Sequence, residues 1–350
     1  LTVDGVELYP NASLGVSVFP QDGEAAETLV KNAGAARREV KRTQASNRWL
    51  FYDDRFNLRA KGRLQQESQL RQALDGNEFE LHYQPRIELA TGRMIAAEAL
   101  LRLPAADGRM IMPGEFIPLA EEAGLIDVLG QWVAEGVCRQ LTTWDLEQVS
   151  PISISMNVSA VELRHARAFH DRLMRLIGSS GIDPRRLELE ITETVLMENA
   201  ADCIEVLGEL RAQGISIAID DFGTGYSSLS QLRELPVTVV KIDREFIKTL
   251  DESDDAHGLI KGMITMAHSL GLRVTAEGVE RPTQVRLLRE MECDEVQGYL
   301  FAKPLPLHEL NALLDIAKRW EVGGQSNKIL RPRLWRGGRS AAHDRAQGSG

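Results

Sequence analysis

The stretch Leu187-Glu-Leu-Glu-Ile-Thr192 alternates apolar and polar side chains, and it decides the fold class of this chain. Such alternation predicts a β-strand with one apolar face and one polar face. In a barrel the apolar face lies under the outer helices, so Glu188 and Glu190 are expected to point into the interior. An unpaired buried carboxylate costs on the order of several kcal/mol, so each needs a cation or dense hydrogen bonding.

Working outward, seven more stretches have strand patterns: 79–88, 94–101, 152–158, 215–220, 237–242, 273–277 and 294–301. Helical patterns lie between most of them, at 128–147, 160–178, 196–213, 255–270 and 281–291. This order predicts an α/β fold, a TIM-like (β/α)8 barrel. The connection 89–93 is too short for a crossover helix, so the first two strands should pair antiparallel. We therefore expect a barrel with one antiparallel strand.

The predicted barrel covers residues 78–320, and three other segments flank it. Residues 1–57 predict a small α+β fragment that is too short for a core of its own. Residues 58–77 predict a linker helix. Residues 321–350 form a basic tail, in which Asp344 is the single acid from residue 322 onward. Disorder is the plain interpretation of this tail, and a basic arm that touches an anionic partner is the alternative.

Composition limits the class of protein. The chain has 350 residues, 43% of them hydrophobic, and its net charge of -10 disfavours binding to DNA. The three cysteines are far apart and predict neither a disulfide framework nor a cysteine zinc site. Without a long apolar run or a signal peptide, a cytoplasmic location is expected for this fragment. Because the chain begins at Leu1 rather than Met, an upstream sensor or membrane-tethering segment stays an open alternative.

Polar side chains lie at the C-terminal ends of the predicted strands. Enzymes with this fold have their active sites at that end of the barrel. The residues in question are Glu98, Asn157, Glu190, Asp220, Asp221, Lys241 and Glu277. Their oxygens suit hard divalent cations, Mg²⁺ or Mn²⁺. Five carboxylates exceed the charge of one ion, so we expect two, as in in-line displacement at a phosphoester. Lys241 is then placed to orient the attacking water or to stabilise charge at phosphorus.

Each of these residues also has a plainer interpretation. Asp220-Asp221 before Phe-Gly-Thr-Gly225 is compatible with a turn and a helix cap. A glutamate or a lysine inside a barrel can be one half of a structural ion pair, and Asn157 can make an ordinary hydrogen bond. The convergence of all these groups on one face favours a functional site.

Eight ordered motifs carry a family resemblance: Tyr83-Gln-Pro85, Ala97-Glu-Ala-Leu-Leu-Arg102, Asn157-Val-Ser159, Glu190-Ile-Thr-Glu193, Asp220-Asp-Phe-Gly-Thr-Gly225, Lys241-Ile-Asp243, Ala276-Glu-Gly-Val-Glu280 and Gln297-Gly-Tyr-Leu-Phe301. Over about residues 64–317 the chain resembles the EAL-domain family of cyclic-di-GMP phosphodiesterases. The resemblance implies metal-dependent hydrolysis of cyclic-di-GMP to pGpG, and a homodimer through the loop 222–228 region. The chain departs from the family at Leu103, where Trp is frequent.

The resemblance also implies roles for single residues. One metal ion would be held by Glu98, Asn157, Glu190 and Asp220, and the second by Asp220 and Asp221, with Glu277 near it or its waters. Lys241 would contact the attacking water, and the catalytic set would be Lys241, Glu277, Asp221 and Glu98. The dinucleotide would be contacted by Gln84, Leu100, Arg102 and Gln297. Glu193 would anchor the loop 222–228, and Glu280 would support the site.

Residues 1–57 resemble the closing third of a GGDEF (diguanylate cyclase) domain, from Ser13-Leu-Gly-Val-Ser-Val-Phe-Pro20 to the strand at 48–52. The signature loop is absent from this chain, and the family's usual helix pattern is altered at Ala33-Gly-Ala-Ala-Arg37. We therefore expect no cyclase activity here, with the remaining GGDEF and sensor region upstream of this chain.

Two rival functions stay open at this point. The first is a receptor that binds cyclic-di-GMP without cleaving it, although such family members usually lack a metal or loop residue that this chain keeps. The second is a barrel hydrolase that acts on a different phosphodiester or phosphate ester.

Overall fold

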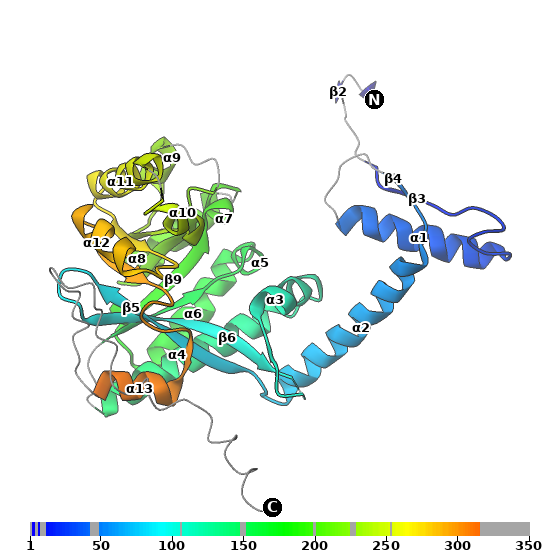
Figure 1. Ribbon diagram of the computed structural model, residues 1–350. Coiled ribbons are helices and arrows are strands. Elements are labelled where there is room, and N and C mark those ends of the chain that lie inside the picture. The colour runs from blue at the N-terminus through cyan, green and yellow to red at the C-terminus, as the bar shows by residue number, and fades with distance from the viewer. Residues whose placement is uncertain are drawn as a thin grey trace, which may run out of the picture. The chain divides into compact units, whose positions relative to one another are not determined.

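The computed structural model describes residues 2–3, 6–7, 12–42, 49–105, 107–147, 152–198, 201–224, 229–252 and 254–315. The basic tail at 321–350 and residues 225–228 of the predicted loop lie outside these ranges. The chain divides into two compact units, Leu1–Asn77 and Glu78–Gly350 (Figure 1). None of the helices in the described part is long and apolar enough to cross a membrane.

Eight strands of the second unit close into a barrel: β5 (Glu80–Glu88), β6 (Met94–Pro104), β8 (Ser153–Asn157), β9 (Leu187–Thr192), β10 (Ser216–Phe222), β11 (Val239–Ile242), β12 (Arg273–Ala276) and β13 (Glu295–Gln297). Around the barrel the order is β5, β13, β12, β11, β10, β9, β8 and β6, and β6 pairs again with β5. β5 pairs antiparallel with β6 and β13, while the other neighbours are parallel. The predicted barrel with one antiparallel strand is therefore confirmed.

Helices surround this barrel (Figure 1): α3 (Pro113–Glu122), α4 (Ile126–Leu146), α5 (Ala160–Leu163), α6 (Ala166–Ser180), α7 (Glu193–Glu198), α8 (Ala201–Ala212), α9 (Leu229–Glu234), α10 (Arg244–Thr249), α11 (Asp254–Ser269), α12 (Pro282–Glu290) and α13 (Leu307–Asp315). Two short strands, β7 (Met110–Ile111) and β14 (Leu305–Pro306), extend the sheet at β6 and β5. The helices expected at 160–178 and 196–213 are each divided into two.

The strand expected at 294–301 is much shorter in the structure, because β13 ends at Gln297. The next residue, Gly298, lies against the backbone of Val279, and a Cβ there would be 2.1 Å from the Val279 carbonyl oxygen. The chain turns at this close approach, which only glycine permits.

The alternation in β9 separates the two sides of the barrel wall. Leu187, Leu189 and Ile191 belong to the large apolar core between strands and helices. Glu188 and Glu190 are each 1% exposed and lie inside the barrel, as the sequence pattern predicts. The interior is thus lined by polar side chains, and the apolar core forms a shell around it.

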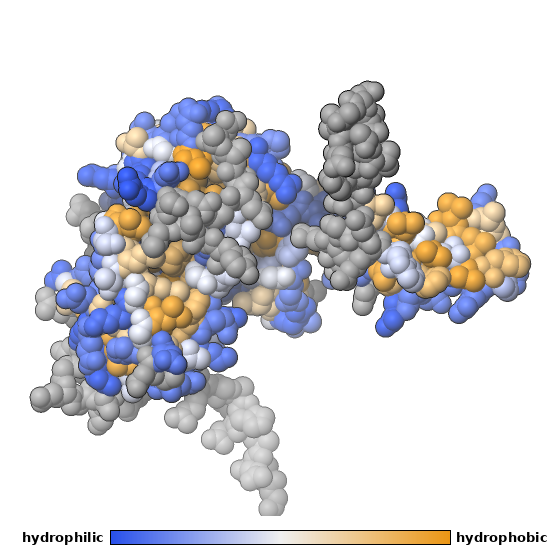
Figure 2. All heavy atoms as spheres, turned by 90° about the horizontal axis from the view of Figure 1, so that it is seen from above, coloured by the Kyte–Doolittle hydropathy of each residue, from blue (hydrophilic) through white to orange (hydrophobic). Residues whose placement is uncertain are grey.

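In the first unit, β3 (Leu14–Val16) and β4 (Trp49–Phe51) form a parallel pair, and α1 (Ala26–Arg42) packs on one face of it. Gly15 allows this approach, since a Cβ would lie 1.9 Å from the Ala33 carbonyl oxygen. Leu14, Trp49 and Phe51 are 52%, 60% and 53% exposed. Figure 2 shows an apolar patch on this unit, on the right of the view. The unit also holds β1 (Thr2–Val3), β2 (Val6–Glu7) and α2 (Asp54–Asp75).

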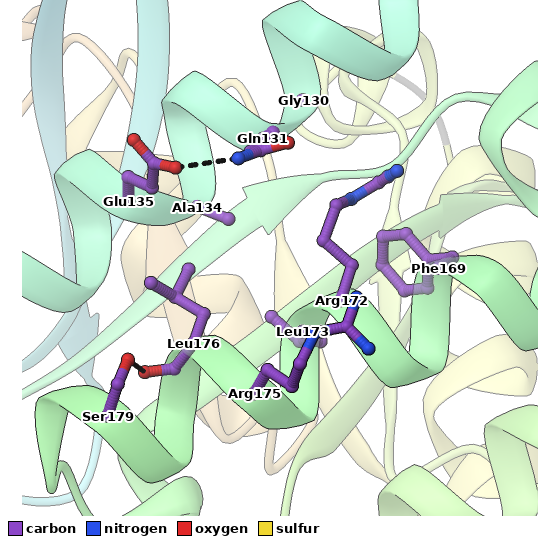
Figure 3. Close-up of a pocket in the computed structure, with 10 residues that line it drawn as sticks. All are labelled: Gly130, Gln131, Ala134, Glu135, Phe169, Arg172, Leu173, Arg175, Leu176 and Ser179. Carbon is purple, nitrogen blue, oxygen red and sulfur yellow. Dashed lines mark hydrogen bonds between the residues drawn. The ribbon is translucent and has the colours of Figure 1, made fainter.

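A pocket of about 570 Å³ lies on the outside of the barrel between α4 and α6 (Figure 3). Ala134, Phe169 and Leu173 give it an apolar wall, and the Arg172 guanidinium lies 5.8 Å from the centre of the Phe169 ring. None of the residues predicted for the functional site lines this pocket. Gly130 and Arg172, which do line it, also lie next to a buried carboxyl group.

That carboxyl group is Glu162, near the start of α5, with only 3% of its surface exposed. Its Oε2 accepts a hydrogen bond of 3.0 Å from the Ser159 amide. Its Oε1 is 3.7 Å from Arg172. Burial, with smaller contributions from Asp127 and Glu121, raises the pKa of Glu162 to about 7 and outweighs the opposite effects of the Ser159 amide and Arg172. The folded protein therefore holds a proton on Glu162 more tightly than the unfolded chain does.

Replacing Glu162 with Gln should flatten the dependence of stability on pH. In the wild type, the unfolded carboxyl loses its proton at lower pH than the folded one, so stability falls as the pH rises from about 4.5 to about 7, by about 2–4 kcal/mol. Glu162→Gln keeps an acceptor for the Ser159 amide and does not titrate. Urea unfolding at pH 5 and pH 8 measures the difference, and the exposed Glu147→Gln is the control. If the free energy of unfolding changed equally between pH 5 and pH 8 in Glu162→Gln and in wild type, the raised pKa of Glu162 would be contradicted.

Candidate active site

The ammonium group of Lys241 lies at the centre of the polar residues at the mouth of the barrel. β11 carries this side chain into the interior, where it is 1% exposed. Its Nζ is 2.6 Å from Glu190 Oε2 and 2.6 Å from Glu277 Oε1. Asp220 Oδ1 is 3.1 Å away and Glu98 Oε2 is 3.8 Å away. The four carboxylates come from β6, β9, β10 and the end of β12, so four strands meet at one cation.

The carboxylates outnumber the cation, and their pKa values reflect this. Burial alone would lower the pKa of Lys241, but the carboxylates around it raise its pKa well above the usual value. Burial and the neighbouring carboxylates raise the pKa of Glu277 to about 8 and that of Glu190 well above its usual value. Burial also acts on Glu98, but Lys241 and two side-chain amides outweigh it and lower the pKa of Glu98. The site therefore attracts positive charge.

Two of the predicted residues supply these amide donors. Asn157 donates to Glu98 Oε1 at 2.9 Å, and Gln297 donates to Glu98 Oε2 at 2.5 Å. Gln297 also donates to Gln84, whose amide in turn donates to the carbonyl oxygen of Ala302 at 3.1 Å. Glu98 is thus fixed from two sides by side chains of two different strands, β8 and β13. Of the residues predicted to bind substrate, Gln297 thus contacts the acidic cluster directly, and Gln84 is linked to it through Gln297.

Asp220 and Asp221 occupy the end of β10, where the backbone bends. Asp221 has a φ of 54°, an uncommon conformation for a residue other than glycine. Burial, with the nearby carboxylates of Asp220 and Asp243, raises the pKa of Asp221 to about 6. Just beyond, Glu193 Oε2 accepts a hydrogen bond of 2.9 Å from the amide of Gly223. Glu193 therefore contacts the described start of the loop 222–228.

The remaining predicted residues lie around this centre with different exposure. Leu100 is half-buried and Arg102 is buried, both on β6. Burial lowers the pKa of Arg102, whose guanidinium donates to the Leu101 carbonyl at 2.8 Å. The side chain of Glu280 is exposed. The assignments of these residues stay predictions.

Three residues that the sequence analysis did not single out belong to the same interior. Asp243 lies two residues after Lys241, has the same parity, and contributes to the raised pKa of Asp221. Beneath Lys241, Arg86 and Glu295 form an ion pair of 2.7 Å inside the barrel. The alternation along each strand could have revealed all three, because residues two positions apart face the same side. Arg86 is two residues from Gln84, and Glu295 is two residues from Gln297.

The donor set fits divalent cations by its chemistry. All the donors are carboxylate or amide oxygens, and Glu190 Oε1 and Asp220 Oδ1 are buried without a hydrogen-bond partner among the described residues. In the same part of the chain, no three or more His, Cys, Asp or Glu side chains are grouped as a ready-made metal site. The carboxylates are instead drawn toward Lys241, which acts as their counter-ion.

The fold and the site define a class: a TIM-like barrel with one antiparallel strand and an acidic, lysine-centred site at the C-terminal ends of its parallel strands. The chain belongs to the EAL domain family, whose model matches residues 67–304.

Two relatives and one solved structure support this membership. The chain is 42% identical, over 90% of its length, to the cyclic di-GMP phosphodiesterase NbdA of Pseudomonas aeruginosa. It is 38% identical, over 87%, to the bifunctional diguanylate cyclase/cyclic di-GMP phosphodiesterase MucR of the same species. The matches cover 40% and 44% of these two relatives, so the chain spans less than half of each. A solved structure of the PaMucR phosphodiesterase in complex with c-di-GMP has 39% identity and a TM-score of 0.66, covering 69% of this chain and 97% of that one.

Removing the central cation should destabilise the barrel. Lys241→Met leaves four carboxylates without their shared partner, so we expect the free energy of unfolding to fall by about 3–5 kcal/mol. Urea unfolding in the presence of a chelator measures this. Lys261→Met, at an exposed position of α11, is the control and should stay within about 0.5 kcal/mol of wild type. A Lys241→Met protein as stable as this control would contradict the role of Lys241 as counter-ion.

Proposed function

We propose that this chain is a metal-dependent phosphodiesterase that hydrolyses cyclic-di-GMP to linear pGpG. The observation that carries the proposal is the set of four carboxylates from four strands around Lys241. These residues occupy the positions of the family's motifs, and the chain belongs to the EAL domain family. The name of NbdA, a cyclic di-GMP phosphodiesterase, supports the choice of substrate.

We propose two divalent cations, Mg²⁺ or Mn²⁺, as cofactors. Glu98, Asn157, Glu190 and Asp220 would hold one, and Asp220 and Asp221 the other, with Glu277 beside it. When bound, such ions activate water and neutralise phosphate charge. The excess of carboxylates over the single ammonium group favours this assignment, since added cations would lower the electrostatic cost of the crowded site.

The residues of the chain would then have catalytic, substrate-binding and supporting roles. Lys241 keeps its proton and orients the attacking water or offsets charge at phosphorus, together with Glu98, Asp221 and Glu277. Gln84, Leu100, Arg102 and Gln297 would contact the dinucleotide. The Gln297 amide is already bonded to Glu98, so a substrate contact at Gln297 would reach the acidic cluster directly. Glu280 would support the site from its rim.

Removing one carboxylate should abolish turnover and spare the fold. For Glu98→Ala and Asp220→Ala we expect the rate of pGpG formation to fall more than about 100-fold, because each loses a proposed metal ligand. Chromatography of the products, with Mg²⁺ or Mn²⁺ and with a chelator, measures this, and circular dichroism checks the fold. Glu147→Gln is the surface control.

Rates like those of wild type in either alanine variant would overturn the metal assignment. Tight binding of intact cyclic-di-GMP without turnover by the wild type would favour a receptor. Faster turnover of cyclic mononucleotides or of pGpG would favour a different hydrolase.

We further propose the division of the chain into a GGDEF-like remnant at 1–57, a linker helix at 58–77, the barrel at 78–320 and a basic tail at 321–350. The first unit supports the remnant: its parallel strand pair is covered by α1 on one face, and the apolar residues Leu14, Trp49 and Phe51 are exposed. Such a pair suits a piece of a larger α/β domain. The rest of that domain would lie upstream.

We propose a homodimer through the loop 222–228 region and the adjacent helix α11. A pocket of about 400 Å³ lies between the start of this loop and α11, lined among others by Glu193, Gly223 and Met263. Leu259 lines the same pocket and is 51% exposed. An exposed leucine beside helical glycines suits close packing of a second helix.

A charge on this face should disrupt the dimer. Leu259→Glu places a carboxylate where the proposed contact is apolar, so we expect sedimentation velocity to show a dissociation constant at least about 100-fold higher than that of wild type. Leu146→Glu is the control, because Leu146 is 80% exposed on α4, which the proposed contact does not use. A wild-type monomer, or a dimer unaffected by Leu259→Glu, would contradict the proposed interface.

A further inference from the structure

Below the acidic mouth, the barrel interior holds a second charged layer. The Arg86 side chain from β5 is 2% exposed and forms ion pairs of 2.5 Å with Glu188 and 2.7 Å with Glu295. Glu295 also pairs at 2.6 Å with Arg273, whose side chain is half exposed. Burial alone would raise the pKa of Glu188, but Arg86 outweighs it and lowers that pKa. Glu188 is therefore ionised, and both carboxylates of this layer pair with buried or half-exposed guanidinium groups.

Glu190 joins the two layers. Its Oε2 is 2.6 Å from Lys241 above, and its Oε1 is 3.9 Å from the Arg86 guanidinium below. That Oε1 atom is buried and has no hydrogen-bond partner among the described residues. Glu190 is thus held between two cations, and Arg86 lies on the side away from the mouth.

We propose that Arg86 is a positioning residue that fixes the Glu190 carboxylate from below and so shapes the metal site; this inference rests on the proposed function. Arg86 suits this role because its planar fork reaches several carboxylates at once, and Glu188 and Glu295 hold the fork in place. Arg86 is 2% exposed, and its recorded ion pairs are with Glu188, Glu190 and Glu295. It acts through Glu190, in the way that partners behind a ligand orient it.

A direct measurement of Mn²⁺ binding tests the proposal without turnover. Binding is monitored by the decrease in the electron paramagnetic resonance signal of free Mn²⁺. Loss of a positive charge near the site would by itself tighten cation binding. Loss of positioning would weaken it. For Arg86→Met we expect the dissociation constant for Mn²⁺ to rise about 10-fold. Arg273→Met removes the same charge from the same cluster, but no recorded ion pair links Arg273 to Glu190, so this control should bind Mn²⁺ at least as tightly as wild type.

Arg86→Met leaves buried carboxylates without their partner and can unfold the barrel. The double variant Arg86→Met with Glu188→Gln removes one cation and its nearest anion together, while Glu295 keeps Arg273. This variant preserves the charge balance and should still bind Mn²⁺ about 10-fold more weakly than wild type. Its kcat for cyclic-di-GMP should fall about 10-fold or more, with KM within about 3-fold of wild type.

Mn²⁺ binding at the wild-type level in the double variant would overturn the proposal, and so would equal losses in Arg273→Met. Failure of the proposed function gives a different result: wild type would not cleave cyclic-di-GMP, yet Mn²⁺ binding would still depend on Arg86. A wild-type protein that binds no Mn²⁺ would overturn both.

Discussion

The buried ammonium group of Lys241 is the interaction on which the acidic mouth of the barrel depends. Four strands each bring one carboxylate to it, and charges of one sign this close together would otherwise repel strongly. One cation does not neutralise four carboxylates. Burial and the neighbouring carboxylates raise the pKa values of Glu190 and Glu277, whereas Lys241 and two side-chain amides lower that of Glu98. The same deficit of positive charge that strains the site makes it a place where divalent cations would be favoured.

The rest of the interior follows from the same constraint. A barrel of eight strands needs side chains to fill its centre, and here that filling is polar. Arg86 compensates Glu188 and Glu295 in the lower layer, and Glu190 lies between this layer and Lys241. The apolar residues of the same strands face the helices and supply the hydrophobic stabilisation. On each strand, the face toward the helices thus supplies hydrophobic stabilisation, and the face toward the interior carries the polar groups of the site.

Much of this arrangement could be predicted from local patterns. The alternation in 187–192 places Glu188 and Glu190 inside, and the short connection at 89–93 identifies the antiparallel strand. The strand at 294–301 was predicted too long, because nothing local shows that Gly298 meets the backbone of Val279. Parity along their strands places Arg86 and Glu295 inside the barrel, but it does not show which charges they pair with. A single charged residue in a strand has no partner in its own neighbourhood, and its counter-ion is visible only once the barrel closes.

The sequence by itself determined the fold class, the family, and which side chains face the interior, because alternation along a strand is a property of adjacent residues. It did not determine which charges meet. Lys241 and Glu190 are 51 residues apart, and Arg86 and Glu188 are 102 residues apart. Their contacts depend on the register between strands, such as Asn157 opposite Glu190 and Gln84 opposite Glu98. Only the closed tertiary structure sets that register, since it is the packing of the whole barrel that brings distant strands to the same level.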